Sequence, residues 1–408
     1  MRKPLEGVRV VELGTYVAAP RTARILGDWG ASVIKVESLQ GDVWRYLAKS
    51  FGLPIDPDHA PLFEPDNMNK RDITLDLKSE KGQEVLHKLL AEADVFVTST
   101  RLDGLKRMGI DYENLRVKHP RLIVAQICGF GNQGPLSKNP GFDSACYWGG
   151  AGIAQTWAYE GQTPVSPVPG FGDATAASLL VAAILAALYN REFTGKGEYI
   201  ENSLYGCGIW YNAYGVMASQ PQYNNKYPRP INKALDPLAH FMRSSDGKWL
   251  TVLTPNWDEI IEDVLHMLHM DEYIGDERFM TMAAAREECN FNFVYQAFLK
   301  AHAKFPASYL VEGYTKLNIV ASVLGNPKDV YQSEQAKANN YIATYTLHDG
   351  KPRVIPRNPI HFASQQLPHE TLAPKLGEHS VEILTSLGYP ESEIAQMLID
   401  KVTTTPKK

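Results

Sequence analysis

A glycine-rich loop around one carboxylate is the part of this sequence best suited to covalent chemistry. Asp173 closes the stretch 169–173 (PGFGD) and directly precedes an apolar run. One role for it is a helix N-cap, because an aspartate there accepts a backbone N–H of the first turn. The other is a nucleophile, since the flanking glycines let a reactant approach closely and an ordinary carboxyl is ionised at neutral pH. Attack on an acyl donor would give a mixed anhydride, with free N–H groups at the helix start stabilising the oxyanion. The pattern alone leaves both roles open.

Motifs of several common enzyme classes are missing from the sequence. It contains no P-loop for phosphoryl transfer, no G-x-S-x-G elbow for a serine hydrolase, and no G-x-G-x-x-G fingerprint after the first strand-like run. His266 and His269 have no cysteine or glutamate in ligand spacing, so we expect no metal site there. Cys146 has no neighbour that would lower its thiol pKa, and we expect it in the core.

Composition places the chain among soluble globular proteins. Its 408 residues are 44% hydrophobic and 21% charged, with a formal net charge of −5 and no basic block that would favour nucleic acid. The longest apolar run, 174–189, contains Thr175 and Ser178 and is too short for a confident membrane span. The N-terminus shows no apolar signal segment. Four widely spaced cysteines predict a reducing, cytoplasmic setting without disulfides.

Alternating strand and helix patterns must position the glycine-rich loop. Helical periodicity is clearest at 80–93, and the apolar run after Asp173 predicts a buried helix. Runs rich in β-branched residues predict strands at 8–13, 31–37, 73–77, 93–99 and 122–129. Strands separated by helices predict an α/β fold with a mainly parallel, Rossmann-like, doubly wound sheet.

The character of the chain changes beyond residue 205. Residues 206–235 include a stretch rich in proline, asparagine and tyrosine, which we interpret as a long linker or an arm that crosses to a partner. A strand at 249–253 and helices at 257–270 and 290–304 indicate a smaller α+β domain. A strand at 354–362 and helices near 380–387 and 391–400 end the chain. We therefore predict a large domain from 1–205 and 330–408, a small domain from 225–325, and linkers at 206–224 and 326–329.

Short motifs in a fixed order run along nearly the whole chain. Each is weak alone, but about ten in sequence are specific. They are LxGVRVxEL (5–13), GAxVIKVE (30–37), GDxxR (41–45), NKRxxxLDLK (69–78), ADVxV…LxRMG (93–109), GFGxxGP (129–135), PGFD (140–143), GxGD (170–173), TGKGE (194–198) and LGEHxxExLxxLGYxxxEI (376–394). On these motifs the sequence resembles the class III CoA-transferases, the formyl-CoA transferase and CaiB/BaiF type.

The resemblance implies roles for individual residues. The catalytic aspartate of the family falls on Asp173, and the large domain would bind CoA. Arg107 and Lys78 suit CoA phosphates, although both could be solvated surface cations. Arg101 follows a predicted strand, where a phosphate could bind. The acid at 143 either orients substrate or caps a helix. Residues implied at the CoA site are Val17, Ala18, Leu75, Lys78, Ser99, Thr100, Arg101, Arg107 and Asp143.

Within this family, the residues at 77–82 and 167–173 resemble most the branch that acts on 2-hydroxy acids and 2-enoyl-CoA. This branch contains the 2-hydroxyisocaproate and phenyllactate–cinnamoyl-CoA transferases. The resemblance implies that Asp173 attacks an enoyl-CoA and becomes an aspartyl-CoA thioester, which passes CoA to an (R)-2-hydroxy acid in amino-acid fermentation. CoA is then a substrate, with no permanently bound cofactor. The resemblance also implies an interlocked homodimer and a dehydratase that consumes the product. Phenyllactate or a carnitine-like acid remain alternative acceptors.

Positions at which the sequence departs from the family motifs narrow the range of expected substrates. Ser38 replaces a basic residue that binds CoA in some members, Val17 replaces a glutamine near the acyl group, and the glycine-rich lid of formyl-transferring members is missing. An apolar Val17 beside Tyr16 favours a larger, hydrophobic acyl chain. An acyl-CoA racemase of the same superfamily would need a histidine where Phe142 stands. A non-catalytic CoA-binding protein and a nicotinamide-dependent dehydrogenase are further alternatives.

Overall fold

The computed structural model describes residues 2–53, 60–230, 236–254, 256–363 and 370–406. The chain divides into two compact units. Unit 1 comprises Met1–Ile153, Ser166–Val216 and Glu334–Lys408. Unit 2 comprises Ala154–Val165 and Met217–Ser333. The sequence placed the small domain at 225–325, whereas unit 2 also takes in residues 154–165, which no local pattern assigns to it.

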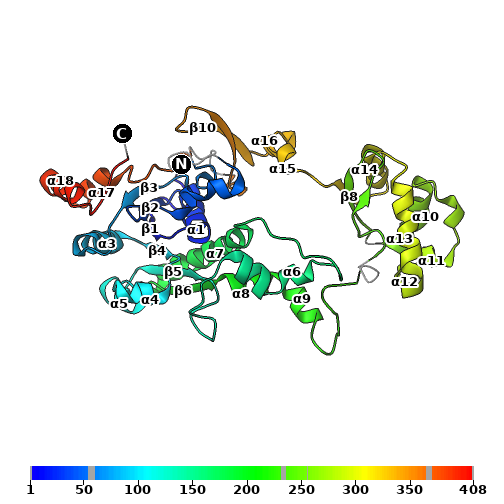
Figure 1. The fold of residues 1–408 in the computed structure, drawn as a ribbon, viewed down its shortest axis with the longest axis horizontal. Coiled ribbons are helices and arrows are strands. Elements are labelled where there is room, and N and C mark those ends of the chain that lie inside the picture. The colour runs from blue at the N-terminus through cyan, green and yellow to red at the C-terminus, as the bar shows by residue number, and fades with distance from the viewer. Residues whose placement is uncertain (1, 54–59, 231–235, 255, 364–369, 407–408) are drawn as a thin grey trace. The chain divides into compact units, whose positions relative to one another are not determined.

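A six-stranded parallel sheet forms the centre of unit 1 (Figure 1). Its order is β3-β2-β1-β4-β5-β6, and every neighbouring pair is parallel. The strands are β1 (Arg9–Leu13), β2 (Ser32–Glu37), β3 (Arg71–Thr74), β4 (Val95–Thr98), β5 (Ile123–Cys128) and β6 (Tyr199–Ser203). The predicted α/β, Rossmann-like fold is confirmed. The strand order reverses direction between β1 and β4, and such a switch point is where open parallel sheets bind ligands.

Helices cover both faces of this sheet because its strands are apolar on both sides. Val10 packs with one set of helices and the next residue, Val11, with the other. On the first face lie α1 (Ala18–Asp28) and α7 (Phe171–Thr194). On the second lie α3 (Glu80–Glu92), α4 (Leu102–Arg107), α5 (Tyr112–Lys118), α17 (Ser380–Ser386) and α18 (Glu391–Ile399).

Shorter elements complete unit 1 around the sheet. These are η1 (Val43–Arg45), η2 (Leu47–Phe51), α2 (Glu64–Asn67), η3 (Ser144–Gly150), α6 (Ile153–Thr156), α8 (Leu204–Tyr211), α9 (Ala213–Ala218), α16 (Glu334–Ala338), β10 (Ile342–Thr346) and β11 (Pro352–Pro356), with α6 and α9 reaching into unit 2. The pair β10 and β11 is an antiparallel hairpin. The predicted strand at 354–362 is wrong beyond residue 356. Pro356 and Pro359 lack the N–H that a strand would use.

Helix α7 is long and apolar enough to cross a membrane by length and composition alone. In this fold its buried side chains, including Ala176, Leu180 and Ile184, join the core that contains α1 and the strands. One face of α7 therefore packs in the core, as the apolar run predicts, whereas Tyr189 and Phe193 near its end are exposed, so the prediction of a buried helix is correct only in part.

The predicted linker at 206–224 is wrong for its first part, which is helical. Ser203 begins α8 by accepting the N–H of Gly206 at 3.0 Å, and α9 follows directly. The run LYGCGIWYNAYGVMA is apolar on nearly all sides, with glycines and an asparagine that disguise its helical period. The linker predicted at 326–329 likewise includes most of a short helix, α15 (Pro327–Val330).

Unit 2 has its own core beside a three-stranded antiparallel sheet of order β7-β8-β9. Its strands are β7 (Met242–Arg243), β8 (Trp249–Leu253) and β9 (Val320–Val323). Its other helices are α10 (Trp257–Met267), η5 (Asp271–Tyr273), α11 (Glu277–Met280), α12 (Met282–Arg286), α13 (Glu288–His302) and α14 (Ala307–Lys316).

Candidate active site

Asp173 lies in the first turn of α7, as the third residue of the helix, and not at its N-cap. The N-cap is Gly170, which has a left-handed backbone (φ 85°). The N-cap interpretation of Asp173 is therefore wrong. The capping acceptor is Asp143, whose Oδ2 accepts the N–H groups of Gly170 at 3.0 Å and Gly172 at 3.1 Å.

The glycines of this loop are required by close packing. A Cβ on Gly170 would lie 3.3 Å from Cγ2 of Val17, and the positive φ would strain any other residue. A Cβ on Gly172 would lie only 2.6 Å from the ring of Tyr147. The loop is thus held between the segment after β1 and the helix η3.

Two backbone N–H groups at the start of α7 already donate hydrogen bonds within the protein. Phe171 N–H donates to the carbonyl of Val168, and that of Gly172 donates to Asp143. The expectation of free N–H groups for an oxyanion is therefore wrong for Phe171 and Gly172.

The surroundings of Asp173 change its titration. Burial raises the pKa of Asp173 to about 7, the nearby carboxylates of Asp143 and Asp66 raise it as well, and Arg21 opposes them. The side chain is partly buried, and Arg21 is itself paired with Asp66. An ordinary aspartate is fully ionised at neutral pH, whereas the raised pKa of Asp173 keeps part of its carboxyl protonated there.

The residues implied at the CoA site gather at the carboxyl edge of the sheet. Val17 and Ala18 follow β1, residues 75 and 78 follow β3, and residues 99–101 follow β4. Because the strands are parallel, all these segments leave the same edge. The edge agrees with the expected place for a phosphate-bearing ligand.

Three of these residues are exposed cations, namely Lys78, Arg101 and Arg107. Arg101 donates to the carbonyl of Lys138 at 3.5 Å. Within the part of the chain that the structure describes, no ion pair takes up the charge of any of the three. Lys78 and Arg101 follow β3 and β4 at this edge, Arg107 ends α4, and cations of this kind can bind phosphates.

Other residues that the resemblance implied at the CoA site are buried or hydrogen-bonded within the protein. The side chain of Leu75 is fully buried in the core, so only its backbone could touch a ligand. Ser99 Oγ accepts the N–H of Thr15 at 3.2 Å, and Thr100 donates its N–H to Thr98. These hydrogen bonds shape the loops after β1 and β4.

Three aromatic side chains lie close to one another beside the loop 169–173. The sequence pointed to Tyr16 and Phe142 but not to Trp44. The rings of Tyr16 and Phe142 meet edge to face at 5.1 Å, and Trp44 lies 6.1 Å from Tyr16. Phe142 is 54% exposed, so its ring faces solvent or a ligand. Tyr16 has a left-handed backbone (φ 65°), which is strained for a tyrosine.

A buried charge cluster holds Tyr16 in that conformation, and sequence reasoning missed it. Lys35 Nζ lies 2.8 Å from Glu12 and 3.1 Å from Asp42, whose other oxygen accepts the N–H of Tyr16 at 3.0 Å. Burial alone would lower the pKa of Lys35, but the two carboxylates raise it above its usual value. A lysine in the middle of an apolar strand was the signal that could have revealed the cluster.

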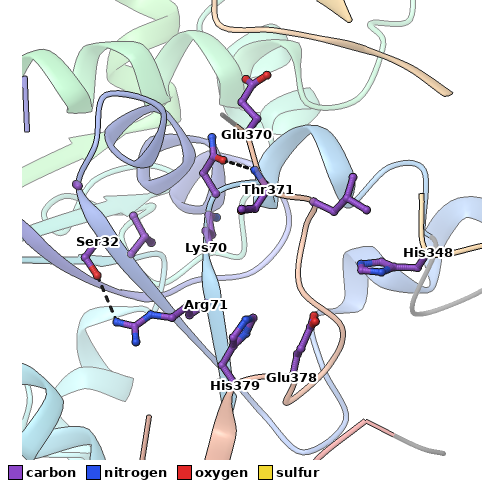
Figure 2. Close-up of a pocket in the computed structure, with 12 residues that line it drawn as sticks. Ser32, Lys70, Arg71, His348, Glu370, Thr371, Glu378 and His379 are labelled. Carbon is purple, nitrogen blue, oxygen red and sulfur yellow. Dashed lines mark hydrogen bonds between the residues drawn. The ribbon is translucent and has the colours of Figure 1, made fainter. Parts of the chain in front are cut away.

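A pocket of about 590 Å³ lies elsewhere in unit 1 (Figure 2). It is lined by Ser32 and Arg71, which begin β2 and β3, together with His348 and His379. It therefore opens at the amino ends of these strands, opposite to the edge expected for CoA. Lys70, also in its wall, directs its ammonium to Glu12 at 2.7 Å.

No metal site emerges among the described residues, where no group of three or more histidine, cysteine or acidic side chains could hold an ion. Cys146 is buried, as expected for a core residue, and burial raises the pKa of its thiol to about 11.

Comparison with known proteins finds similarity to CoA-transferases along nearly the whole chain. The sequence model of CoA-transferase family III matches residues 5–380. The chain is 36% identical to an (R)-2-hydroxy-4-methylpentanoate CoA-transferase of Clostridioides difficile, covering 98% of this chain and 99% of that one. It is 33% identical to a cinnamoyl-CoA:phenyllactate CoA-transferase of Clostridium sporogenes, covering 97% and 96%. A CaiB/BaiF family protein from Brucella suis has a similar fold, with a TM-score of 0.81 and 30% identity, covering 95% of this chain and 100% of that one.

Proposed function

The chain belongs to CoA-transferase family III, and from this membership we propose that it moves CoA from a 2-enoyl-CoA, or a related acyl-CoA, to a free (R)-2-hydroxy acid. The enzyme class itself follows from the family: the protein is a CoA-transferase that uses acyl-CoA as substrate. The acceptor that we favour is 2-hydroxyisocaproate, which is 2-hydroxy-4-methylpentanoate. The 36% identity over the full chain to a transferase named for that acid is the observation that carries the proposal.

Asp173 is the proposed nucleophile. Its carboxylate oxygen attacks the thioester carbonyl of the donor, the C–S bond breaks, and a mixed anhydride and CoA thiolate form. The thiolate then attacks the side-chain carbonyl of Asp173, which releases the donor acid and leaves an aspartyl-CoA thioester. The acceptor carboxylate reverses both steps and departs as the new thioester. One thioester is exchanged for another, so no ATP is consumed.

The surroundings of the loop support an apolar side chain on the substrate. Tyr16, Val17 and Phe142 place apolar groups next to Gly170, and Phe171 is half-exposed at the loop itself. A leucine-derived or phenylalanine-derived acid could bury its side chain against such groups. Phe142 carries no exchangeable proton, which disfavours a racemase that needs a base at this position.

Cationic side chains at the carboxyl edge are the proposed partners of CoA. Lys78, Arg101 and Arg107 are exposed, the first two after β3 and β4, and Val17 and Ala18 lie at the start of α1. Arginine binds phosphate with two parallel hydrogen bonds, which suits the phosphates of CoA.

A homodimer in the cytoplasm completes the proposal. Large apolar side chains remain exposed at the end of α7 and on α8 and α9, as expected for a surface covered by a second copy. The four cysteines are free, which suits a reducing compartment. A dehydratase acting on 2-hydroxyacyl-CoA is the class of enzyme that would use the product. The exposed apolar side chains of these helices include Tyr189 (70% exposed), Phe193 (72%), Trp210 (70%) and Tyr214 (91%).

A panel of acceptors tests the reaction. The purified enzyme is incubated with one enoyl-CoA donor and, separately, 2-hydroxyisocaproate, phenyllactate and carnitine, and the CoA esters are identified by mass spectrometry. We expect the hydroxyacyl-CoA of 2-hydroxyisocaproate to form fastest. Transfer to none of the three acids would reject the proposed substrate class. Deuterium entering the α-carbon of a chiral 2-methylacyl-CoA in deuterated water would instead favour the racemase.

A further inference from the structure

Asp143 is buried and caps α7 from a distant part of the chain, and not the helix η3 that directly follows it. Its side chain is almost completely buried (4% exposed), so a substrate has little access to it. It precedes η3 but makes no side-chain capping bond to that helix. Its Oδ2 is instead directed to two N–H groups, those of Gly170 and Gly172, which lie 27 and 29 residues further along the chain.

Two N–H groups converging on one oxygen fix the shape of the loop. Residues 170 and 172 are drawn inward to the carboxylate, while Phe171 between them is 51% exposed. Asp173 is the next residue, so the direction in which its carboxyl leaves the loop depends on this pair of hydrogen bonds. Charge-assisted hydrogen bonds of this kind are stronger than neutral ones.

The segment that carries Asp143 is itself anchored to the sheet. A Cβ on Gly141 would lie 2.8 Å from Cα of Gly129, the residue directly after β5, and 2.5 Å from Sγ of Cys146. Only glycines permit this approach of the two backbones. The carboxylate is therefore carried by a rigid part of unit 1, as a positioning group must be.

We propose that Asp143 is a positioning residue of the reaction, which clamps the loop ahead of α7 and places a second negative charge beside the Asp173 carboxyl. The clamp rests on the proposed role of Asp173 as nucleophile. It departs from the role in CoA binding that the family resemblance implied for this residue.

The charge on the clamp also acts on the nucleophile. Burial is the larger cause of the raised pKa of Asp173, and the carboxylate of Asp143 is the next. The titratable or charged groups around Asp173 are Arg21 on α1, Asp66 on α2, Asp143 before η3, and Cys146 and Tyr147 on η3.

Asp143→Asn separates the charge from the shape of the clamp. The amide oxygen still accepts hydrogen bonds, but the negative charge is gone. The measurement is the rate at which enzyme-bound CoA thioester forms from enoyl-CoA in a single turnover, as a function of pH. We expect the acidic midpoint of that rate to fall by about one pH unit and the maximal rate to fall about tenfold. An unchanged or raised midpoint would overturn the influence of its charge on Asp173.

Asp143→Ala removes the clamp itself. Hydrogen exchange followed by NMR should show faster exchange of the Gly170 and Gly172 amides, while circular dichroism confirms the fold. If these two amides exchange as slowly as in the wild type, the clamp is wrong. This readout needs no turnover, so it remains decisive even if Asp173 is not the nucleophile. Should the alanine variant not fold, the same exchange measurement on Asp143→Leu replaces it, because leucine has a similar size and accepts no hydrogen bond.

Asp111→Asn is the matched control. Asp111 is a buried aspartate of unit 1 that hydrogen-bonds to Asn114 at the start of α5. We expect its variant to keep the wild-type midpoint. A wild-type enzyme that carries CoA on Asp173, together with unshifted midpoints in both variants, would refute the charge effect while sustaining the proposed function.

Discussion

The carboxyl group of Asp173 is where the proposed chemistry can be tested most directly. Asp173→Asn keeps the size of the side chain and removes the nucleophile. We expect transferase activity to fall by at least about 10³-fold, since no neighbouring group replaces the lost carboxylate. Intact-protein mass spectrometry should detect the CoA adduct on the wild type and none on the variant. Near-wild-type turnover, or peptide mapping that places the adduct on another residue, would contradict the mechanism.

The raised pKa of Asp173 predicts a pH dependence of the first half-reaction. Only the ionised carboxylate attacks, so the rate of thioester formation should rise with pH through a midpoint near 7, the pKa of this group. The check is a single-turnover series from pH 5 to 9 with enoyl-CoA alone. A rate already at its plateau at pH 5 would show that the carboxyl titrates as an ordinary aspartate.

The same group links stability to pH, with a sign that follows from the direction of the shift. Because the folded-state pKa lies above the unfolded value, the stabilising contribution is full at low pH and is lost as pH rises toward 7. Asp173→Asn lacks this loss. We expect the difference in Tm between Asp173→Asn and the wild type to grow in favour of the variant from pH 4 to pH 7. Above pH 7 the difference should stay constant. Parallel melting curves that never diverge would contradict the burial of this charge.

At the scale of the elements, the packing of α7 on η3 depends on Gly172, which has no side chain. Gly172→Ala would drive a methyl group into the ring of Tyr147. We expect a loss of about 1–3 kcal/mol in the free energy of unfolding and a lower rate of thioester formation. Gly325→Ala is the control, because no atom lies within 4 Å of the added methyl group. Equal stability of the two variants in urea titrations would argue against this packing.

The buried lysine of β2 supports the loop after β1. Lys35→Met would leave Glu12 with one cationic partner, Lys70, and would leave Asp42 without its ammonium. Breaking such a buried pair costs about 3–5 kcal/mol. We expect the variant to unfold at a correspondingly lower urea concentration. A stability within about 0.5 kcal/mol of the wild type would show that the cluster does not need this charge.

At the scale of the whole molecule, the exposed aromatic surface of α7, α8 and α9 bears on assembly. We expect analytical ultracentrifugation to find a dimer that persists on dilution, because an interlocked pair separates only on unfolding. Tyr214→Ser should lower the urea concentration at which the dimer unfolds, while circular dichroism before unfolding matches the wild type. A folded monomer of the wild type at micromolar concentration would contradict the proposed assembly.

Much of the fold could be predicted from the sequence because its signals are local. Periodicities of two and near four residues indicated parallel strands alternating with helices, and the glycine-flanked Asp173 stood out before an apolar run. The helices at 204–218 could not be predicted, because apolar residues on every side leave no helical periodicity to detect. The buried side chain of Leu75 and the charge pair on Lys35 escaped because burial depends on which elements pack together.

The sequence by itself determined the class of fold and the family, and its motif order pointed to Asp173 as the residue that we propose as nucleophile, since residue types and motif order are readable along the chain. Tertiary structure alone decided how that residue is held and charged. Residues 143 and 170 are 27 positions apart, and only the folded backbone brings the carboxylate of one to the N–H of the other. The pKa of Asp173 likewise depends on the exclusion of water and on neighbouring charges, which exist only once the chain has packed.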